Sequence, residues 1–228
     1  MKIYSFSGKG NREINEDYYA NIEFCEHSSL HVIADGIGGY SYGEVAAQTA
    51  VSTIVNYLSE KYQVPDIEKN IRESLLQANE QIRIKQKELH SKLGATIAGV
   101  YINREIAYAF WLGDVQIFHF RNQELLFVSE NHSLINEMKK NGVVSSKDIE
   151  RFGNIVTKSL SGVVFEEEIK ISPLKLECND CIFLCSDGLY RRIDPRLLIS
   201  QTNSELDEKM KAHDASVEDN YTLIRLIM

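Results

Sequence analysis

The sequence has few prolines and cysteines and no long apolar run. Its 228 residues include 3 prolines (Pro65, Pro173 and Pro195) and no low-complexity tract, so no linker divides the chain and we expect a single domain over residues 1–228. No stretch approaches the roughly 18 apolar residues that a membrane-spanning helix needs. The N-terminal residues also lack the apolar block of a secretory signal. We therefore expect a cytoplasmic protein with no membrane partner.

Basic residues are fewer than acidic ones. Lys plus Arg number 25 against 33 Asp plus Glu, which gives a net charge of −8. That sign is wrong for a protein whose main partner is a polyanion, and it argues against nucleic acid. Cysteine is rare, but Cys178, Cys181 and Cys185 lie in ECNDCIFLCSDG. In a strand Cys181 and Cys185 would share a face with Phe183, which favours core packing over a metal or redox role.

Hydropathy patterns predict an α+β domain of two packed sheets with helices outside. Short alternating or apolar segments are typical of strands, and apolar residues at helical spacing indicate two long amphipathic helices. Strands are expected at Lys2–Ser7, Tyr18–Phe24, Leu30–Ala34, Thr96–Ile102, Ile106–Leu112, Gln116–Arg121, Leu125–Val128, Ile169–Ile171, Asp180–Cys185 and Tyr221–Met228. The four strands from Thr96 to Val128 suggest an antiparallel meander. The long helices are expected at 43–62 and 67–89, with shorter ones at 134–140 and after Pro195.

Aspartates fall at the ends of several expected strands. Asp35, Asp114 and Asp187 follow strands and adjoin glycines, and Asp219 precedes the last strand. Each one alone is compatible with an ordinary tight turn. Together at one rim of a sheet, however, these carboxylates would repel one another unless a cation lay between them. Because oxygen-only ligands suit Mg²⁺ or Mn²⁺, the pattern predicts a metal centre.

An arginine lies close to two further acidic residues near the N-terminus. In GNREINEDYY, Arg12 precedes Glu16 and Asp17. Beside an acidic metal site, a guanidinium provides a fork that grips two phosphate oxygens. A solvated polar loop before a strand is the alternative interpretation.

Seven blocks of sequence carry a resemblance to a known family. They are GNREINED, VIADGIGGYSYGEVAA, LGATIAGVYI, FWLGDVQIFHF, ENHSL, NDCIFLCSDGL and EDNYTLI. In their order and spacing, over nearly the whole chain, they resemble the metal-dependent serine/threonine protein phosphatases of type 2C, the PPM family, in its bacterial form. The resemblance implies a four-layer α-β-β-α sandwich of two antiparallel sheets flanked by helices. It also implies hydrolysis of phosphoserine and phosphothreonine on proteins by a water between two Mn²⁺ or Mg²⁺ ions.

The resemblance further implies which residues hold the ions. Asp35 matches the aspartate that bridges both ions, and Gly36 matches the glycine whose carbonyl completes one coordination shell. Asp187 and Asp219 match the carboxylates that hold the second ion. The expected partners are phosphorylated proteins, the products of a serine/threonine kinase, and the expected oligomeric state is a monomer.

Four other residues match outer parts of the family's site. Glu16 and Asp17 match acidic residues that act around the first ion, partly through water. Arg12 matches the arginine that binds the substrate phosphate. Asp114 matches the aspartate that, with Asp187, helps to hold a third, weaker ion in bacterial members.

The sequence also departs from the family pattern. Ile37 stands where some members carry a histidine that is a candidate general acid, and we predict that His132 does not replace it. Residues 113–116 read GDVQ where the family usually has GDSR. Residues 141–165 match the flap that varies between members.

Two other functions remain open on the sequence alone. One is a catalytically silent phosphatase-like module that binds phosphoproteins or a regulatory partner. A decayed copy would be expected to lose a carboxylate, whereas Arg12, Asp35, Asp187 and Asp219 are all present. The other is an enzyme that keeps the metal site but hydrolyses small phosphate esters or diesters.

Overall fold

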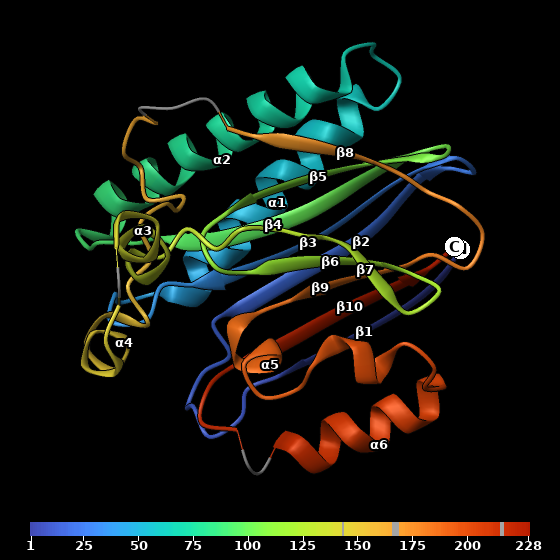
Figure 1. Cartoon of the computed structure of the whole chain (residues 1–228). Coiled ribbons are helices and arrows are strands. Elements are labelled where there is room, and N and C mark those ends of the chain that lie inside the picture. Colours follow the sequence, from blue (N-terminus) through green and yellow to red (C-terminus); the bar gives the residue numbers. More distant parts are fainter. Residues whose placement is uncertain (143, 166–168, 215–216) are drawn as a thin grey trace.

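Two five-stranded antiparallel sheets pack face to face in the computed structural model, which describes residues 1–142, 144–165, 169–214 and 217–228 (Figure 1). The first sheet has the order β1 (Lys2–Gly8), β10 (Tyr221–Ile227), β9 (Cys181–Cys185), β6 (Gln116–Arg121) and β7 (Glu124–Val128). The second has the order β2 (Asp17–Cys25), β3 (Ser28–Gly36), β4 (Ala95–Asn103), β5 (Ile106–Leu112) and β8 (Ile171–Lys175).

Two long helices, α1 (Gly43–Lys61) and α2 (Ile67–Leu89), cover the outer face of the second sheet (Figure 1). Their apolar stripes pack Ile54 and Leu75 into one buried cluster with Val32 and Ile97 of the sheet. Helix α2 begins after Asp66, whose side chain accepts a hydrogen bond from the backbone N–H of Lys69, as expected of a helix cap.

Shorter helices cover the outer face of the first sheet. They are α5 (Asp187–Tyr190), the 3₁₀ helix η1 (Pro195–Leu198) and α6 (Asn203–Asp214). Leu206 and Met210 of α6 are fully buried in a cluster with Cys181, Phe183 and Cys185 of β9. The predicted α-β-β-α sandwich and the core role of these two cysteines are therefore confirmed.

The predicted meander from Thr96 to Val128 is wrong. Strand β4 pairs with β5 and β6 pairs with β7, but the chain changes sheets between β5 and β6. Gly113 lies in the link between the two sheets and has a φ of +113°, a conformation that residues other than glycine rarely adopt. A Cβ at this position would also collide with Thr96. An alternation of apolar residues predicts a strand but does not predict which sheet the strand joins.

Three helices and one strand differ from the sequence prediction. Helices α4 (Ser146–Phe152), α5 and α6 were not predicted, and the strand expected at Ile169–Ile171 lies at Ile171–Lys175. This strand, β8, is at an edge of its sheet. An edge strand tolerates a proline such as Pro173, because the N–H that proline lacks can be one that would face away from the sheet. None of the described helices is long and apolar enough to cross a membrane.

Candidate active site

The strand ends bring five aspartates to one end of the sandwich. Asp17 opens β2 directly opposite Asp35 near the end of β3. Asp187 follows β9, Asp219 precedes β10, and Asp114 lies in the link between β5 and β6. This end is at left in Figure 1, opposite the end at which β10 finishes. The structure therefore brings aspartates that are distant in sequence to one rim.

Burial and mutual repulsion raise the pKa values of the aspartates at this rim. Burial, reinforced by Asp187 and Asp219, raises the pKa of Asp17 to about 7 although two hydroxyl hydrogen bonds oppose the shift. Burial and the neighbouring carboxylates raise the pKa of Asp35 well above its ordinary value. Burial, then Asp187, raises the pKa of Asp114 to about 6. The rim thus gathers more carboxylates than its two neighbouring arginines, Arg12 and Arg191, can neutralise.

Asp17 is held so that one carboxylate oxygen remains unpaired. Its Oδ2 accepts hydrogen bonds from Ser186 Oγ at 2.8 Å and Thr222 Oγ1 at 2.6 Å. Its Oδ1 is buried and makes no hydrogen bond. A buried carboxylate oxygen without a partner is costly, and a cation would satisfy it.

The Arg12 loop is fastened to the start of β10 by Asn220. The side-chain Nδ2 of Asn220 donates to the carbonyls of Lys9 and Ile14, and its Oδ1 accepts from the backbone N–H of Glu16 at 2.8 Å. Arg12 Nη2 then lies 3.0 Å from Asp219 Oδ1, with the arginine side chain 47% exposed. The loop thus presents a guanidinium at the acidic rim with part of its surface open to solvent.

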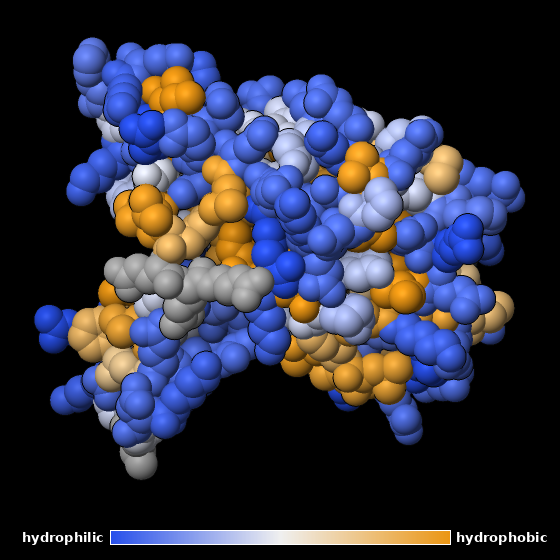
Figure 2. Space-filling model, turned by 90° about the horizontal axis from the view of Figure 1, so that it is seen from above, coloured by the Kyte–Doolittle hydropathy of each residue, from blue (hydrophilic) through white to orange (hydrophobic). Residues whose placement is uncertain are grey.

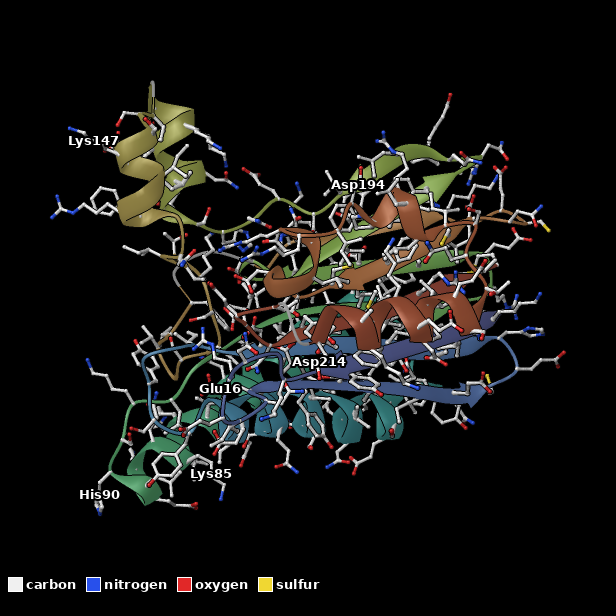
Figure 3. All side chains as sticks on the ribbon, turned by 90° about the horizontal axis from the view of Figure 1, so that it is seen from below. Glu16, Lys85, His90, Lys147, Asp194 and Asp214 are labelled. Atoms are coloured by element: carbon white, nitrogen blue, oxygen red, sulfur yellow. The ribbon has the colours of Figure 1, made fainter. Side chains whose placement is uncertain are left out.

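Glu16 and Gly36 lie where the start of α1 meets the rim. Burial, then Glu44, raises the pKa of Glu16, while a hydrogen bond from the Gly43 N–H opposes the shift. A side chain at Gly36 would collide with the backbone of Gly43, so only glycine allows this approach of β3 to α1. Figure 3 shows Glu16 at the same end of the sheets as Lys147 of α4 and His90, which follows α2.

The flap predicted at residues 141–165 is partly helical and belongs to a longer excursion. Helices α3 (Leu134–Asn141) and α4 project from the same end as the carboxylates (Figure 1), and Val143 lies outside the described residues. The two ends of the flap are joined at its base by a β-bridge between Ser133 and Val156 and by a hydrogen bond from the Thr157 N–H to the His132 carbonyl. The space-filling view is notched at this end of the molecule (Figure 2).

The donor set fits a hard divalent cation, although side chains now occupy the rim. Among the described residues no three His, Cys, Asp or Glu side chains are grouped closely enough to hold an ion as they stand. Arg12 pairs with Asp219, and Arg191 Nη2 lies 3.2 Å from Asp187 Oδ2 and 3.6 Å from Asp114 Oδ2. The carboxylate donors and the unpaired Asp17 Oδ1 nevertheless suit Mg²⁺ or Mn²⁺.

Several structural partners of the site were missed in the sequence. Ser186, Asn220 and Thr222 are at most 4% exposed and hold Asp17 and the Arg12 loop in place. The available signal was their position beside Asp187 and Asp219, in CSDGL and EDNYTLI. A sequence without its strand pairing does not show which polar neighbours of an aspartate turn inward.

The α-β-β-α sandwich with an acidic rim beside an arginine is the arrangement that the sequence resemblance implies. Residues 8–219 match the family described as Protein phosphatase 2C. The chain belongs to this family, which confirms the resemblance in the sequence and makes it a phosphoprotein phosphatase of the serine/threonine type.

Individual relatives agree with this assignment. The chain is 26% identical over 228 residues to the serine/threonine phosphatase Stp of Listeria welshimeri, with 93% of this chain and 90% of that protein covered. The structure of the S. agalactiae serine/threonine phosphatase shares the fold, with a TM-score of 0.81, 24% identity and 98% of both chains covered. The catalytic domain of the phosphatase PstP, in complex with two manganese ions, also shares it, with a TM-score of 0.81, 18% identity, and 100% and 98% covered.

Proposed function

We propose that the chain hydrolyses phosphoserine and phosphothreonine in proteins at the acidic rim, with two Mn²⁺ or Mg²⁺ ions. The observation that supports this is the convergence of five carboxylates from separate strand ends, one with a buried unpaired oxygen, beside a half-exposed arginine. The fold shared with a phosphatase bound to two manganese ions supports the identity of the cofactor.

We assign the ion-holding role to Asp35, Asp187 and Asp219, with the carbonyl of Gly36. Two such ions, when bound, would supply a water of lowered pKa as nucleophile and would offset the negative charge on the attacking and leaving oxygens. In our proposal Asp17 and Glu16 position water around the ions. The paired hydroxyls on Asp17 Oδ2 favour this, because they fix the direction in which Oδ1 faces.

Arg12 is proposed as the group that binds the substrate phosphate. It lies at the rim, half exposed, with one nitrogen on Asp219 and further N–H groups available to a ligand. A guanidinium binds two phosphate oxygens in a fixed orientation, which would hold phosphorus over the carboxylates.

We also propose that the chain acts as one catalytic domain and as a monomer, in the cytoplasm, on the products of a serine/threonine kinase. The pairing of β1 with β10 along their length, from Lys2 with Ile227 to Gly8 with Tyr221, supports a single domain because it joins the two ends of the chain.

The test is release of phosphate from a phosphothreonine peptide with Mn²⁺, with EDTA and with the Asp187→Asn variant. The matched control is Asp194→Asn, since Asp194 is an exposed aspartate that caps η1 away from the rim (Figure 3). We expect release that requires Mn²⁺, is lost in Asp187→Asn and is kept in Asp194→Asn. A folded protein that binds the peptide without hydrolysing it would instead be a silent module. Activity restricted to small esters would support the other alternative.

A further inference from the structure

Arg191 places a permanent positive charge between two carboxylates of the rim. It follows α5, four residues after Asp187, and its backbone N–H donates to the Asp187 carbonyl. This turn brings the guanidinium back over the start of the helix. There Nη2 lies 3.2 Å from Asp187 Oδ2 and 3.6 Å from Asp114 Oδ2.

The same guanidinium reaches the base of the flap. Arg191 Nη1 donates to Asn154 Oδ1 at 2.6 Å, immediately after α4. Beside it, Asn131 Nδ2 donates to the hydroxyl of Tyr190 at 3.0 Å, which adds a second link between α5 and the flap base. One side chain therefore connects Asp114, Asp187 and the flap.

We infer that Arg191 replaces a third divalent ion at the Asp114–Asp187 pair and ties this part of the rim to the flap. The inference rests on the proposed function, because it concerns how many ions the same rim accepts. A guanidinium at this distance neutralises part of the charge that would attract a cation and occupies the space between the two carboxylates. Arg191 is a positioning residue, since it acts through Asp187 and Asn154.

Counting bound ions tests the inference without relying on activity. Mn²⁺ is titrated into the full chain and the bound equivalents are counted by calorimetry and by electron paramagnetic resonance. We expect two equivalents for the wild type and a third, weaker equivalent for Arg191→Gln. The third should disappear again in Arg191→Gln combined with Asp114→Asn.

Two matched variants separate the charge at this position from a general effect of losing an arginine. Arg192→Gln removes the exposed neighbouring arginine, and we expect it to bind two equivalents. Arg191→Lys keeps the charge but cannot place separate nitrogens on the carboxylates and on Asn154. We expect it to bind two equivalents, with a several-fold higher KM for a phosphopeptide and a similar rise in Asn154→Ala.

The outcomes distinguish the inference from the proposed function. If the wild type binds three equivalents, or if Arg191→Gln still binds two while the wild type binds two, the inference is overturned and the proposed function stands. If the wild type binds no Mn²⁺, the proposed function fails and the inference fails with it. A third site that appears in Arg192→Gln as well would also overturn the assignment to Arg191.

Discussion

Strand β9 has an aspartate at each end, and their pKa values shift in opposite directions: that of Asp180 is lowered, whereas burial raises that of Asp187. Asp180, before the strand, is fully buried and accepts hydrogen bonds from Arg121 Nε at 2.8 Å, Arg121 Nη2 at 2.8 Å and the Glu177 N–H at 2.8 Å. His119 Nε2 lies 2.9 Å from it. Although burial opposes ionisation, these partners lower its pKa to about 2.

The rim at the other end of β9 has less compensation, because Arg12 and Arg191 face several carboxylates at once. Asp17, Asp35 and Asp114 are surrounded by further carboxylates, and their pKa values are raised. Removing one partner of a buried ion pair costs stability, whereas removing one carboxylate from a crowded group relieves repulsion. The acidic rim therefore keeps carboxylates that cost stability, as is typical of binding and catalytic sites.

The largest expected effect is on catalysis. Asp35→Asn should reduce phosphate release by about 10³-fold or more, because a group central to transition-state stabilisation is lost. In EDTA the same variant should melt at a higher temperature than the wild type, since a neutral side chain relieves the repulsion on Asp35. A phosphate assay and thermal melts in EDTA measure both. A variant that is inactive and also less stable would contradict the comparison.

The opposite aspartate should show the reverse pattern. Asp180→Asn should lower the free energy of unfolding by about 2 kcal/mol, because Arg121 and the Glu177 N–H lose a buried, charged hydrogen-bond acceptor. The folded fraction should keep the activity of the wild type. Urea unfolding measures the loss. The control is Glu177→Gln, which removes a half-exposed partner of the same arginine and should cost less than about 1 kcal/mol.

The raised pKa values at the rim predict an unusual pH dependence without metal. Because the folded protein holds protons on Asp17 up to a pKa of about 7, it binds more protons than the unfolded chain between about pH 4 and 7. The rim contribution to stability therefore falls as the pH rises through this window. Between pH 5 and 7, urea unfolding in EDTA should show a larger decrease, by on the order of 1 kcal/mol, for the wild type than for Asp35→Asn.

His31 contributes in the opposite direction and does not affect that difference. Burial lowers its pKa to about 4, so its contribution to stability is lost as the pH falls below its ordinary value. It remains present in both proteins being compared. Equal slopes for the wild type and Asp35→Asn would show that the rim carboxylates do not share protons as the structure indicates.

A smaller effect is expected from the hydroxyls that orient Asp17. Ser186→Ala or Thr222→Val should weaken Mn²⁺ binding about 10- to 100-fold and cost about 1 kcal/mol of stability. Calorimetric titration and urea unfolding measure the two effects. Ser59→Ala is the control, because the Ser59 hydroxyl is exposed and donates to the Val55 carbonyl within α1.

The smallest effect is expected from His132. Its Nδ1 accepts a hydrogen bond from the Gly113 N–H at 3.2 Å, its ring stacks on Trp111, and burial followed by Lys158 lowers its pKa to about 4. His132→Ala should leave the acidic limb of the pH profile of kcat/KM in place. Loss of that limb would identify His132 as the proton donor to the leaving group.

Much of this protein could be predicted from its sequence because the relevant signals are local. Apolar periodicity located the long helices and most strands, since a buried stripe must repeat every 3.6 residues and a buried strand face every two. The acidic residues next to glycines located Asp35, Asp114 and Asp187, because carboxylates at strand ends fit neither core nor strand. Helices α4 and α6 were not predicted, because their sequences are mostly polar and show no clear apolar stripe.

Only the tertiary structure decided how these local elements meet. Whether β5 continues into the same sheet as β6 depends on the backbone at Gly113, and the apolar pattern of the strands is the same in either case. The hydroxyls on Asp17 come from Ser186 and Thr222, which are 169 and 205 residues away. Likewise, the two ends of β9 look alike as sequence. One became an ion-paired cluster because Arg121 and His119 of β6 pack against Asp180. The other became an acidic rim because strand pairing brings further carboxylates, such as Asp17 and Asp35, beside Asp187.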